Sequence, residues 1–364
     1  MSDIFDYLLW RGDLSLTAVP LNPVDTLILS ELSYLGLEGL VPGDFRHPVP
    51  LKVMAEAMLA LPDRENRVRT KKDLDLLAAC AQAPRFRDLW LLFYSNELLP
   101  EIQSQFAAVT WLLPENGALI TYRGTDLTLT GWKEDFNMSF QSSVPAQEKA
   151  LWYLEAFARV HGGPLYLAGH SKGGNLAVYA AARCQPGVRR RIEAVHNHDG
   201  PGFFSTMLED LGYREVLPRV RTFVPQSSVV GMLLEHEEPY SVIRSRQLSL
   251  LQHDPYSWEV LGGDFVRVEE IDANSRFLDS TIKTWLAQTS LEERNAFVDA
   301  VYELLSLGQS DDLRDVILPR NVLRYLRQLG TDEQLRSVIA REFAELFRTA
   351  LELRKKKALP ELPQ

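Results

Sequence analysis

The stretch Gly169-His170-Ser171-Lys172-Gly173 decides how this chain is interpreted, because it is a Gly-x-Ser-x-Gly pentapeptide in a specific setting. The run before it, residues 164–168, is short and apolar and predicts a buried strand, whereas the alanine-rich run 175–183 predicts a helix. A strand, a sharp turn and a helix in this order are typical of a nucleophile elbow, which holds a serine hydroxyl at the tip of the turn. We therefore predict that Ser171 is a catalytic nucleophile.

The two glycines of this turn have a steric explanation. A Cβ atom at Gly169 or Gly173 would collide with the neighbouring strand or helix. The following helix places its free N–H groups and the positive end of its dipole beneath the serine. When Ser171 attacks a carbonyl group, the carbonyl oxygen becomes negatively charged and needs hydrogen-bond donors. The backbone N–H of Lys172 is the first of these donors.

Composition is compatible with an enzyme and excludes several other classes of protein. The chain has 364 residues, 46% of them hydrophobic, which is enough for one large catalytic domain and a smaller piece. A net charge of −10 argues against a nucleic-acid partner, because phosphate binding needs clustered cations. Cys80 and Cys184 are far apart and form neither a disulfide framework nor a metal motif. We expect no metal and no cofactor.

The sequence also contains no targeting or membrane signal that we can recognise. Residues 1–13 carry acids and lack a basic start followed by a long apolar run, so they do not resemble a signal peptide. No stretch approaches ~18 consecutive apolar residues, the minimum for a membrane-spanning helix. We expect a cytoplasmic protein.

Alternating strand and helix patterns predict an α/β fold with a mostly parallel sheet and helices on both of its faces. An Asn22-Pro23 start signal precedes one of the helical patterns, and Pro114 to Gly117 is a turn between two strands that we expect to form a hairpin. The predicted helices are 23–40, 51–61, 70–82 and 146–160, and the predicted strands are 106–113, 118–122, 192–196 and 220–224.

The pattern changes after Ile271. From there it is helical, including 291–307 and 332–357, with no strand signal. We therefore predict two parts, a catalytic domain at 1–270 and a C-terminal helical segment at 271–364. The basic run Arg354 to Lys357 is interpreted as a solvated helix end, and it also permits a weak contact with a membrane surface.

A serine nucleophile needs a histidine base, and in α/β-hydrolases the chain order is serine, acid, histidine. The histidines that follow Ser171 are His196, His198, His236 and His253. His253 lies in a loop late in the domain, and its position makes it the preferred base. His236, in a strongly acidic patch, is the alternative base, and either histidine could instead be a solvated loop residue with no role.

Asp199 is the best candidate for the acid. It follows the predicted strand 192–196 and precedes a tight turn that starts at Gly200. Catalytic acids of open α/β sheets lie at the carboxyl ends of strands. The competing interpretation is that Asp199 caps the turn, and Asp254 is then the next acid to test.

A second oxyanion donor should come from a loop after an earlier strand. The segment Thr121 to Asp126 follows the strand 118–122 and contains a glycine and a hydroxyl. Thr125 can offer both its N–H and its Oγ–H, and a donor of this kind is worth ~3 kcal/mol of barrier. The same segment could be an ordinary turn between strand and loop.

These residues together resemble the class 3 lipases, in which a strand ends in Arg-Gly-Thr or Arg-Gly-Ser and leads to a Trp-x-x-Asp segment. Here the matching residues are Arg123-Gly124-Thr125 and Trp132-Lys133-Glu134-Asp135, and Gly169 to Gly174 is similar to the lipase elbow Gly-His-Ser-Leu-Gly-Gly. More closely, the chain resembles the bacterial Mbeg1-like family over roughly residues 20–265. The matching segments are 131–138, 169–175, 199–203, 224–228 and 252–255.

The lipase resemblance implies a carboxylic-ester hydrolase with Ser171 as nucleophile, His253 as base and Thr125 as oxyanion residue. In this interpretation Asp135 supports the loop by accepting hydrogen bonds, and the alternative is a plain solvated acid next to Lys133 and Glu134. The substrate class that it implies is a small-molecule or lipid ester. One departure is that class 3 lipases place their acid in an Asp-x-Val-Pro segment, whereas Ser227 to Val230 contains no carboxylate. Either Asp199 takes the role, or the triad is incomplete.

A second departure is Lys172, where lipases usually carry an apolar residue. Its cation would favour an anionic group near the reacting ester, or it would point to solvent. The incomplete lipase pattern supports an alternative function, namely a non-catalytic α/β-hydrolase relative that acts as a binding or regulatory module. The intact elbow, His253 and Thr125 favour the hydrolase.

Overall fold

The computed structural model describes all residues except 1, 127, 139–140, 272, 309–318 and 359–364. Within the described residues, eight strands form one sheet, and their order in the sheet follows their order in the chain. The strands are β1 (Val49–Pro50), β2 (Trp90–Leu99), β3 (Ser104–Leu112), β4 (Ala118–Tyr122), β5 (Leu165–His170), β6 (Ile192–His198), β7 (Val220–Pro225) and β8 (Tyr240–Ile243).

The pairing divides the sheet into an antiparallel and a parallel part. Strands β1 to β4 pair antiparallel, and the predicted hairpin is confirmed as β3–β4, with Leu112 opposite Ala118. Strands β4 to β8 are parallel, and β5 lies between β4 and β6, with Gly169 beside Tyr122 and Asn197. The sheet is an α/β-hydrolase sheet in which β5 delivers the elbow. Strands β2 and β8 have no counterpart among the predicted elements.

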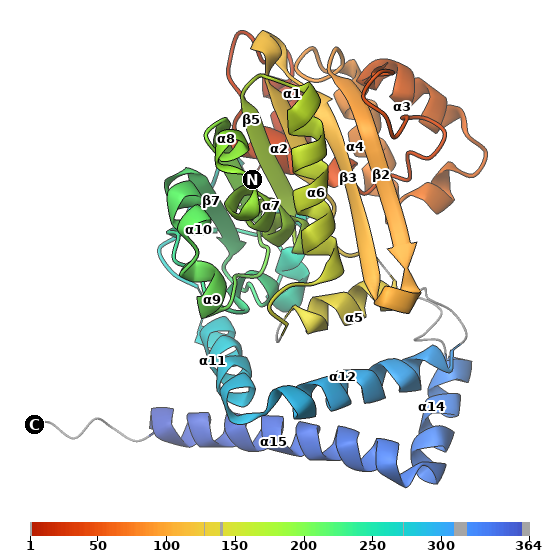
Figure 1. The fold of residues 1–364 in the computed structure, drawn as a ribbon, viewed down its shortest axis with the longest axis vertical. Coiled ribbons are helices and arrows are strands. Elements are labelled where there is room, and N and C mark those ends of the chain that lie inside the picture. The colour runs from red at the N-terminus through yellow and green to blue at the C-terminus, as the bar shows by residue number, and fades with distance from the viewer. Residues whose placement is uncertain (1, 127, 139–140, 272, 309–318, 359–364) are drawn as a thin grey trace, which may run out of the picture.

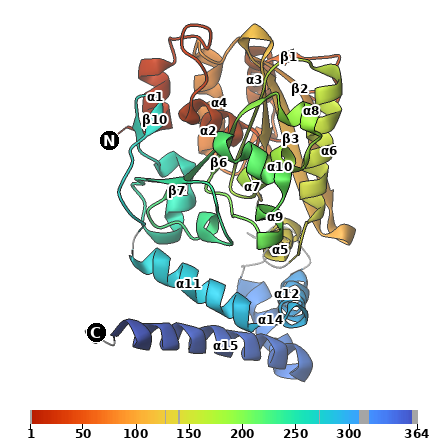
Figure 2. The same cartoon turned by 60° about the vertical axis from the view of Figure 1, so that its left-hand side comes forward.

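Helices pack on both faces of the sheet, as predicted, and join it in one compact unit (Figures 1 and 2). The helices before the parallel strands are α1 (Ile4–Arg11), α2 (Pro23–Leu32), α3 (Leu51–Ala60) and α4 (Lys71–Gln82). Between and after these strands lie α5 (Leu129–Asn137), α6 (Pro145–Val160), α7 (Lys172–Arg183), α8 (Pro186–Arg189), α9 (Ser205–Leu208) and α10 (Leu211–Val216). A small ribbon pairs β9 (Val260–Leu261) with β10 (Asp264–Phe265).

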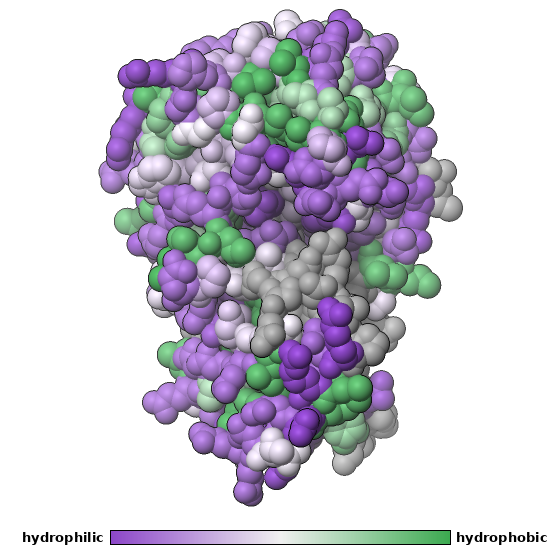
Figure 3. All heavy atoms as spheres, turned by 90° about the vertical axis from the view of Figure 1, so that its right-hand side faces the viewer, coloured by the Kyte–Doolittle hydropathy of each residue, from purple (hydrophilic) through white to green (hydrophobic). Residues whose placement is uncertain are grey.

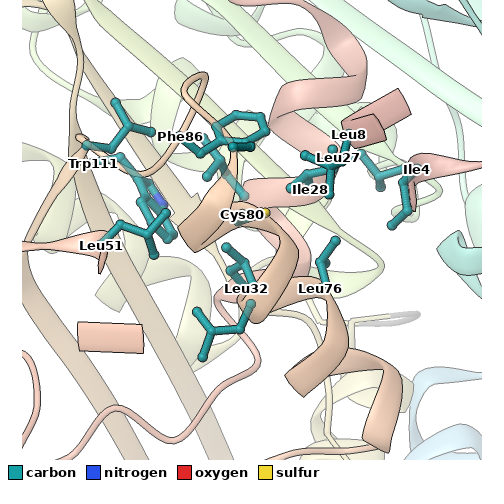
Figure 4. Close-up of a cluster of buried hydrophobic side chains, with 14 of the residues drawn as sticks. Ile4, Leu8, Leu27, Ile28, Leu32, Leu51, Leu76, Cys80, Phe86 and Trp111 are labelled. Carbon is teal, nitrogen blue, oxygen red and sulfur yellow. The ribbon is translucent and has the colours of Figure 1, made fainter. Parts of the chain in front are cut away.

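Alternate residues of the strands point to two separate hydrophobic cores. On β4, Leu119 belongs to the core beneath α1 to α4, whereas Ala118 and Ile120 belong to the core beneath α6 and α7. This period of two is what buries a sheet on both faces. Figure 4 shows part of the first core, to which several helices and a strand contribute; the labelled residues are Ile4, Leu8, Leu27, Ile28, Leu32, Leu51, Leu76, Cys80, Phe86 and Trp111.

One predicted helix is shorter than its hydrophobic pattern. The start signal is confirmed, because Asn22 caps α2 and Pro23 occupies its first turn, but the helix ends at Leu32 rather than at residue 40. From Ser33 to Leu35 the backbone turns through i to i+3 hydrogen bonds. Leu35 and Leu37 are still fully buried in the same core. The apolar spacing therefore continued past the helix because irregular chain also covers this core.

The described residues after Ile271 are helical, as the sequence predicts. They form α11 (Ala273–Gln288), α12 (Leu291–Ser306), α14 (Pro319–Thr331) and α15 (Glu333–Ala358), which lie together beyond one end of the sheet (Figures 1 and 2). Helix α12 packs against α5, where Lys133 Nζ lies 2.8 Å from Asp299 Oδ1. The division of the chain at residue 271 stays a prediction.

The outer surface carries mixed polarity. On the face seen in Figure 3, hydrophobic residues occur in small groups among hydrophilic ones, which is ordinary for folded proteins. The backbone of the basic run Arg354 to Lys357 belongs to α15, but its side chains beyond Arg354 lie outside the described residues. Among the described helices, none has the length and apolar character needed to cross a bilayer.

Candidate active site

Ser171 has the strained backbone that the elbow requires. It links the end of β5 to the first residue of α7, with φ 59° and ψ −134°. A non-glycine residue at positive φ costs of order 1–3 kcal/mol and persists only where the surroundings impose it. Here the Ser171 N–H donates to the His198 carbonyl on β6 at 2.9 Å, which fixes the turn against the neighbouring strand.

The glycines around Ser171 are needed for close approach, as predicted. A Cβ on Gly169 would lie 2.1 Å from the Gly173 carbonyl carbon, and one on Gly173 would lie 2.0 Å from the Tyr122 carbonyl oxygen. A Cβ on Gly124 would lie 3.0 Å from the Cβ of Ser171 and 2.5 Å from the His170 carbonyl oxygen. The loop after β4, which carries Thr125, therefore lies directly against the serine.

The structure brings His253 and Asp199 together. His253 Nδ1 lies 2.6 Å from Asp199 Oδ2, and the two residues are far apart in the chain. Asp199 follows the end of β6, has φ 57° and is completely buried, whereas the His253 side chain keeps 29% of its exposure. In a catalytic triad, a buried carboxylate on Nδ1 fixes the tautomer and the orientation of the imidazole, and Nε2 is the nitrogen that accepts the serine proton.

His253 is also held beside the elbow through its backbone. His170, the residue before the serine, has its Nε2 2.9 Å from the His253 carbonyl oxygen, and the two rings lie 4.6 Å apart. Because a carbonyl only accepts, Nε2 of His170 carries the proton. Burial, together with the nearby His253, lowers the pKa of His170 well below its usual value, so this ring is neutral. His170 therefore links the loop of His253 to Ser171.

Ser228 occupies the region where lipases would carry their acid. Its hydroxyl donates to Asp199 Oδ1 at 2.5 Å, and Ser228 is buried. The two carboxylate oxygens of Asp199 thus have separate partners, Ser228 on one and His253 on the other. Asp199 lies just beyond the end of β6, and the segment after β7 supplies a hydrogen-bond donor to it.

The remaining candidate histidines lie elsewhere. On β6, Thr26 Oγ1 lies 2.7 Å from His196 Nδ1 and 3.0 Å from His198 Nε2, so both rings face α2. Burial lowers the pKa of His196 to about 3 and that of His198 well below its usual value, which keeps them neutral. His236 pairs with the Glu238 carboxylate at 2.9 Å and with the Gly231 carbonyl at 2.8 Å.

Thr125 and Asp135 are in contact. Thr125 Oγ1 donates to Asp135 Oδ1 at 2.6 Å, which joins the loop after β4 to α5. The Thr125 hydroxyl proton is therefore engaged by Asp135 in this structure. Burial raises the pKa of Asp135 to about 6, while the cation of Lys172 and the hydrogen bond from Thr125 oppose the rise.

The expectation that the Lys172 side chain could point to solvent was wrong. The side chain is 1% exposed, and its Nζ lies 2.8 Å from Glu134 Oε2 on α5. Nζ also donates to the Gln105 carbonyl at 3.0 Å. Packing against α5 makes the charge beside Ser171 part of an internal ion pair. The backbone N–H of Lys172 remains in the first turn of α7 beneath Ser171.

Sequence reasoning missed three residues that structure this site. The segment of Ser228 was considered only for its missing carboxylate, and His170 precedes Ser171 and so was not among the candidate bases. Glu134 lies in the Trp-x-x-Asp segment and had no assigned partner. The one available signal was Lys172, since a buried lysine needs a buried acid.

A model of the Mbeg1-like family matches residues 80–303, which is more than half of the 364 residues. The chain belongs to the Mbeg1-like family. The matched region contains Ser171, Asp199, His253 and Thr125 and extends into α12 of the C-terminal helices.

Two solved lipase structures are similar to this chain. The native propeptide complex of the Rhizomucor miehei lipase is 15% identical, with a TM-score of 0.35, over 51% of this chain and 73% of that chain. The M37 lipase is 12% identical, with a TM-score of 0.38, over 84% of this chain and 98% of that chain. A comparison with curated proteins gives no match.

Proposed function

We propose that this member of the Mbeg1-like family is a serine hydrolase that cleaves carboxylic esters. Ser171 is the proposed nucleophile, His253 the base and Asp199 the acid. The observation that carries the proposal is the 2.6 Å contact between His253 Nδ1 and buried Asp199, together with the elbow conformation of Ser171 and the contact of the adjoining His170 with the His253 carbonyl. This combination of a strained serine, an oriented imidazole and a buried carboxylate is the arrangement that activates a hydroxyl.

The reaction would proceed through an acyl-enzyme. His253 Nε2 accepts the proton of Ser171 as Oγ attacks the ester carbonyl, and Asp199 stabilises the imidazolium that forms. The oxyanion is stabilised by the backbone N–H groups of Lys172 and Thr125, which flank the serine from α7 and from the loop after β4. His253 then protonates the leaving alcohol, and water hydrolyses the acyl-enzyme by the reverse sequence. These steps use side chains, backbone N–H groups and water, so the proposed reaction requires no cofactor.

The alternative of a non-catalytic relative depended on the missing carboxylate after β7. The contact between Asp199 and His253 favours the enzyme instead. The carboxylate after β6 lies against Nδ1 of His253, which is the ring nitrogen that the acid of a catalytic triad contacts. Ser228 further supports this assignment, because it satisfies the second oxygen of the same carboxylate.

Hydrolysis of a short p-nitrophenyl ester tests the proposal. We expect turnover by the wild type and none above background by Ser171→Ala, because the alcohol nucleophile is lost while the strain of the elbow is imposed by its surroundings. Circular dichroism and a thermal melt check that the variant folds. Equal turnover by folded wild type and folded Ser171→Ala would show that Ser171 is not the nucleophile.

A further inference from the structure

We propose that the side chain of Lys172 is a positioning residue for the oxyanion loop, acting through Glu134 and Asp135 on Thr125. This inference rests on the hydrolase function proposed above. It assigns a role to the residue in which the elbow departs from the lipase pattern, and it concerns the side chain rather than the backbone N–H.

The first step is the burial of Lys172. Lys172 is the first residue of α7 and directly follows the proposed nucleophile. Its side chain is 1% exposed and extends toward α5. There it meets the Glu134 carboxylate at 2.8 Å and the Gln105 carbonyl at 3.0 Å. A lysine buried to this degree is costly unless it is paired, so its contacts with α5 and β3 are well defined.

The second step is the fixation of Glu134. Its Oε2 also accepts the backbone N–H of Gln105 at 3.0 Å, and its Oε1 accepts the N–H of Ala146 at 2.9 Å. The ion pair with Lys172 therefore ties α7, β3 and the start of α6 to one point on α5. Such a network sets the position of α5 relative to the elbow.

The third step leads to the oxyanion loop. Asp135, the residue after Glu134, lies 3.9 Å from Lys172 Nζ and accepts the hydroxyl proton of Thr125 at 2.6 Å. The pairing of β3 with β4 also fixes where this loop starts, because Ala108 pairs with Tyr122, the last residue of β4 before the loop. Lys172 therefore acts on Asp135 both by position and by charge.

The charges around Asp135 give this link a sign. The cation of Lys172 and nearby His253 favour the carboxylate, whereas burial and the neighbouring Glu134 disfavour it, and the resulting pKa is about 6. The ionised carboxylate of Asp135 is a stronger acceptor for the hydrogen bond from Thr125 than the protonated carboxyl group is. Removing the cation of Lys172 leaves Glu134 and Asp135 adjacent and uncompensated, so the pKa of Asp135 would rise.

The test compares Lys172→Met with Lys133→Met. Both lysines are buried and paired with a carboxylate, but Lys133 contacts Asp299 on α12 and not the elbow. We expect Lys172→Met to lower kcat about 10–100-fold with KM little changed, and to move the acidic limb of the kcat profile to higher pH. Lys133→Met should lose stability and keep the wild-type profile. Lys172→Arg, which keeps the cation, should recover most of the lost kcat.

A second measurement separates positioning from general damage. Because Lys172 acts on the hydrogen bond of Thr125, the double variant Lys172→Met/Thr125→Ala should have a kcat close to that of Thr125→Ala alone. Fully additive losses would overturn the proposal. If Lys172→Met does not fold, Lys172→Met/Glu134→Gln removes both charges of the pair, and it should fold with a kcat at least about threefold below wild type.

The two proposals fail in different ways. A wild type without esterase activity contradicts the hydrolase proposal itself. The role of Lys172 alone is contradicted if the wild type is active and folded Lys172→Met keeps the wild-type kcat and pH profile. The same result for folded Lys172→Met/Glu134→Gln has the same meaning.

Discussion

Ser228 Oγ donates a hydrogen bond to Asp199 Oδ1 over 2.5 Å, so the segment that lacks the lipase acid binds the carboxylate that we propose as the acid of this site. The carboxylate comes from the end of β6 and the hydroxyl from the segment after the adjacent strand β7. The second oxygen of Asp199 contacts His253. The proposed acid thus follows β6 and not β7, and its carboxylate still contacts Nδ1 of the proposed base. Ser228 holds this carboxylate through a hydrogen bond.

Ser228→Ala tests the role of this hydrogen bond. The buried carboxylate of Asp199 would lose one donor, and a hydrogen bond to a charged group contributes about 1–3 kcal/mol. We expect the free energy of unfolding to fall by about that amount and kcat to fall about 3–30-fold, because Asp199 would hold His253 less firmly. Urea denaturation and ester hydrolysis measure the two effects.

Ser245→Ala is the matched control for that change. Ser245 is also buried, and its hydroxyl pairs with Ser257 at 2.7 Å rather than with Asp199. It should cost stability without a comparable loss of kcat. Equal kcat losses in the two serine variants would remove the special role of Ser228.

The choice between two histidines is tested by their separate removal. We expect His253→Ala to lower kcat by at least ~10³, because the serine then has no base. His236→Gln should lower kcat less than about 10-fold, since both nitrogens of that ring already have partners away from the serine. Steady-state kinetics of both variants would contradict the assignment if His236→Gln were the more damaged enzyme.

Thr125→Ala tests the oxyanion loop. The variant keeps the backbone N–H and loses the hydroxyl that joins the loop to Asp135. We expect kcat to fall about 10–10³-fold with KM little changed, because the loop stabilises charge that exists only in the transition state. Thr125→Ser should recover most of the activity. A change in KM alone would make this loop a binding wall and not an oxyanion hole.

Glu31 gives the fold a pH dependence of known sign. It is completely buried, and burial raises its pKa from 4.5 to about 7 although Arg69 opposes the rise. Between these values the folded chain holds a proton that the unfolded chain has lost, so stability falls as pH rises through this window. We expect wild type to lose about 3 kcal/mol there relative to Glu31→Gln, measured by urea denaturation at a series of pH values.

Glu38→Gln supplies the opposite control. Hydrogen bonds from Asn96 and Tyr94 overcome the effect of burial and lower the pKa of Glu38. Its contribution to stability is therefore present above its unfolded pKa and is lost as pH falls. A stability difference between wild type and Glu31→Gln that does not change with pH would contradict the assignment for Glu31.

Local patterns predicted the elements that position Ser171 and failed where distant residues decide the structure. The glycines around Ser171, the hairpin β3–β4 and the position of Asp199 after a strand each follow from short-range rules, and the structure contains them. The burial of Lys172 depends on Glu134, which lies 38 residues away in the chain. No periodicity within either segment could reveal that contact.

The same distinction explains the secondary structure that was missed. Helix α2 stops at Leu32 although its apolar spacing continues, because the chain beyond it buries leucines in the same core without being helical. Strand β8 is four residues long, and it is held by pairing with β7 on one side and by a bridge from Ile243 to Arg267 on the other. A hydrophobic pattern predicts which residues are buried. Whether those residues form a helix, a strand or irregular chain depends on the elements that pack against them.

Reaction with a fluorophosphonate probe tests the central claim most directly, because the phosphorus centre captures only a serine activated by its base and its oxyanion donors. Intact-mass analysis counts the adducts, and peptide mapping locates them. The proposed function predicts one adduct on Ser171 of the wild type, none on Ser171→Ala and strongly slowed labelling of His253→Ala. A folded wild type that stays unlabelled, or labelling that persists in Ser171→Ala, would contradict a hydrolase centred on this serine.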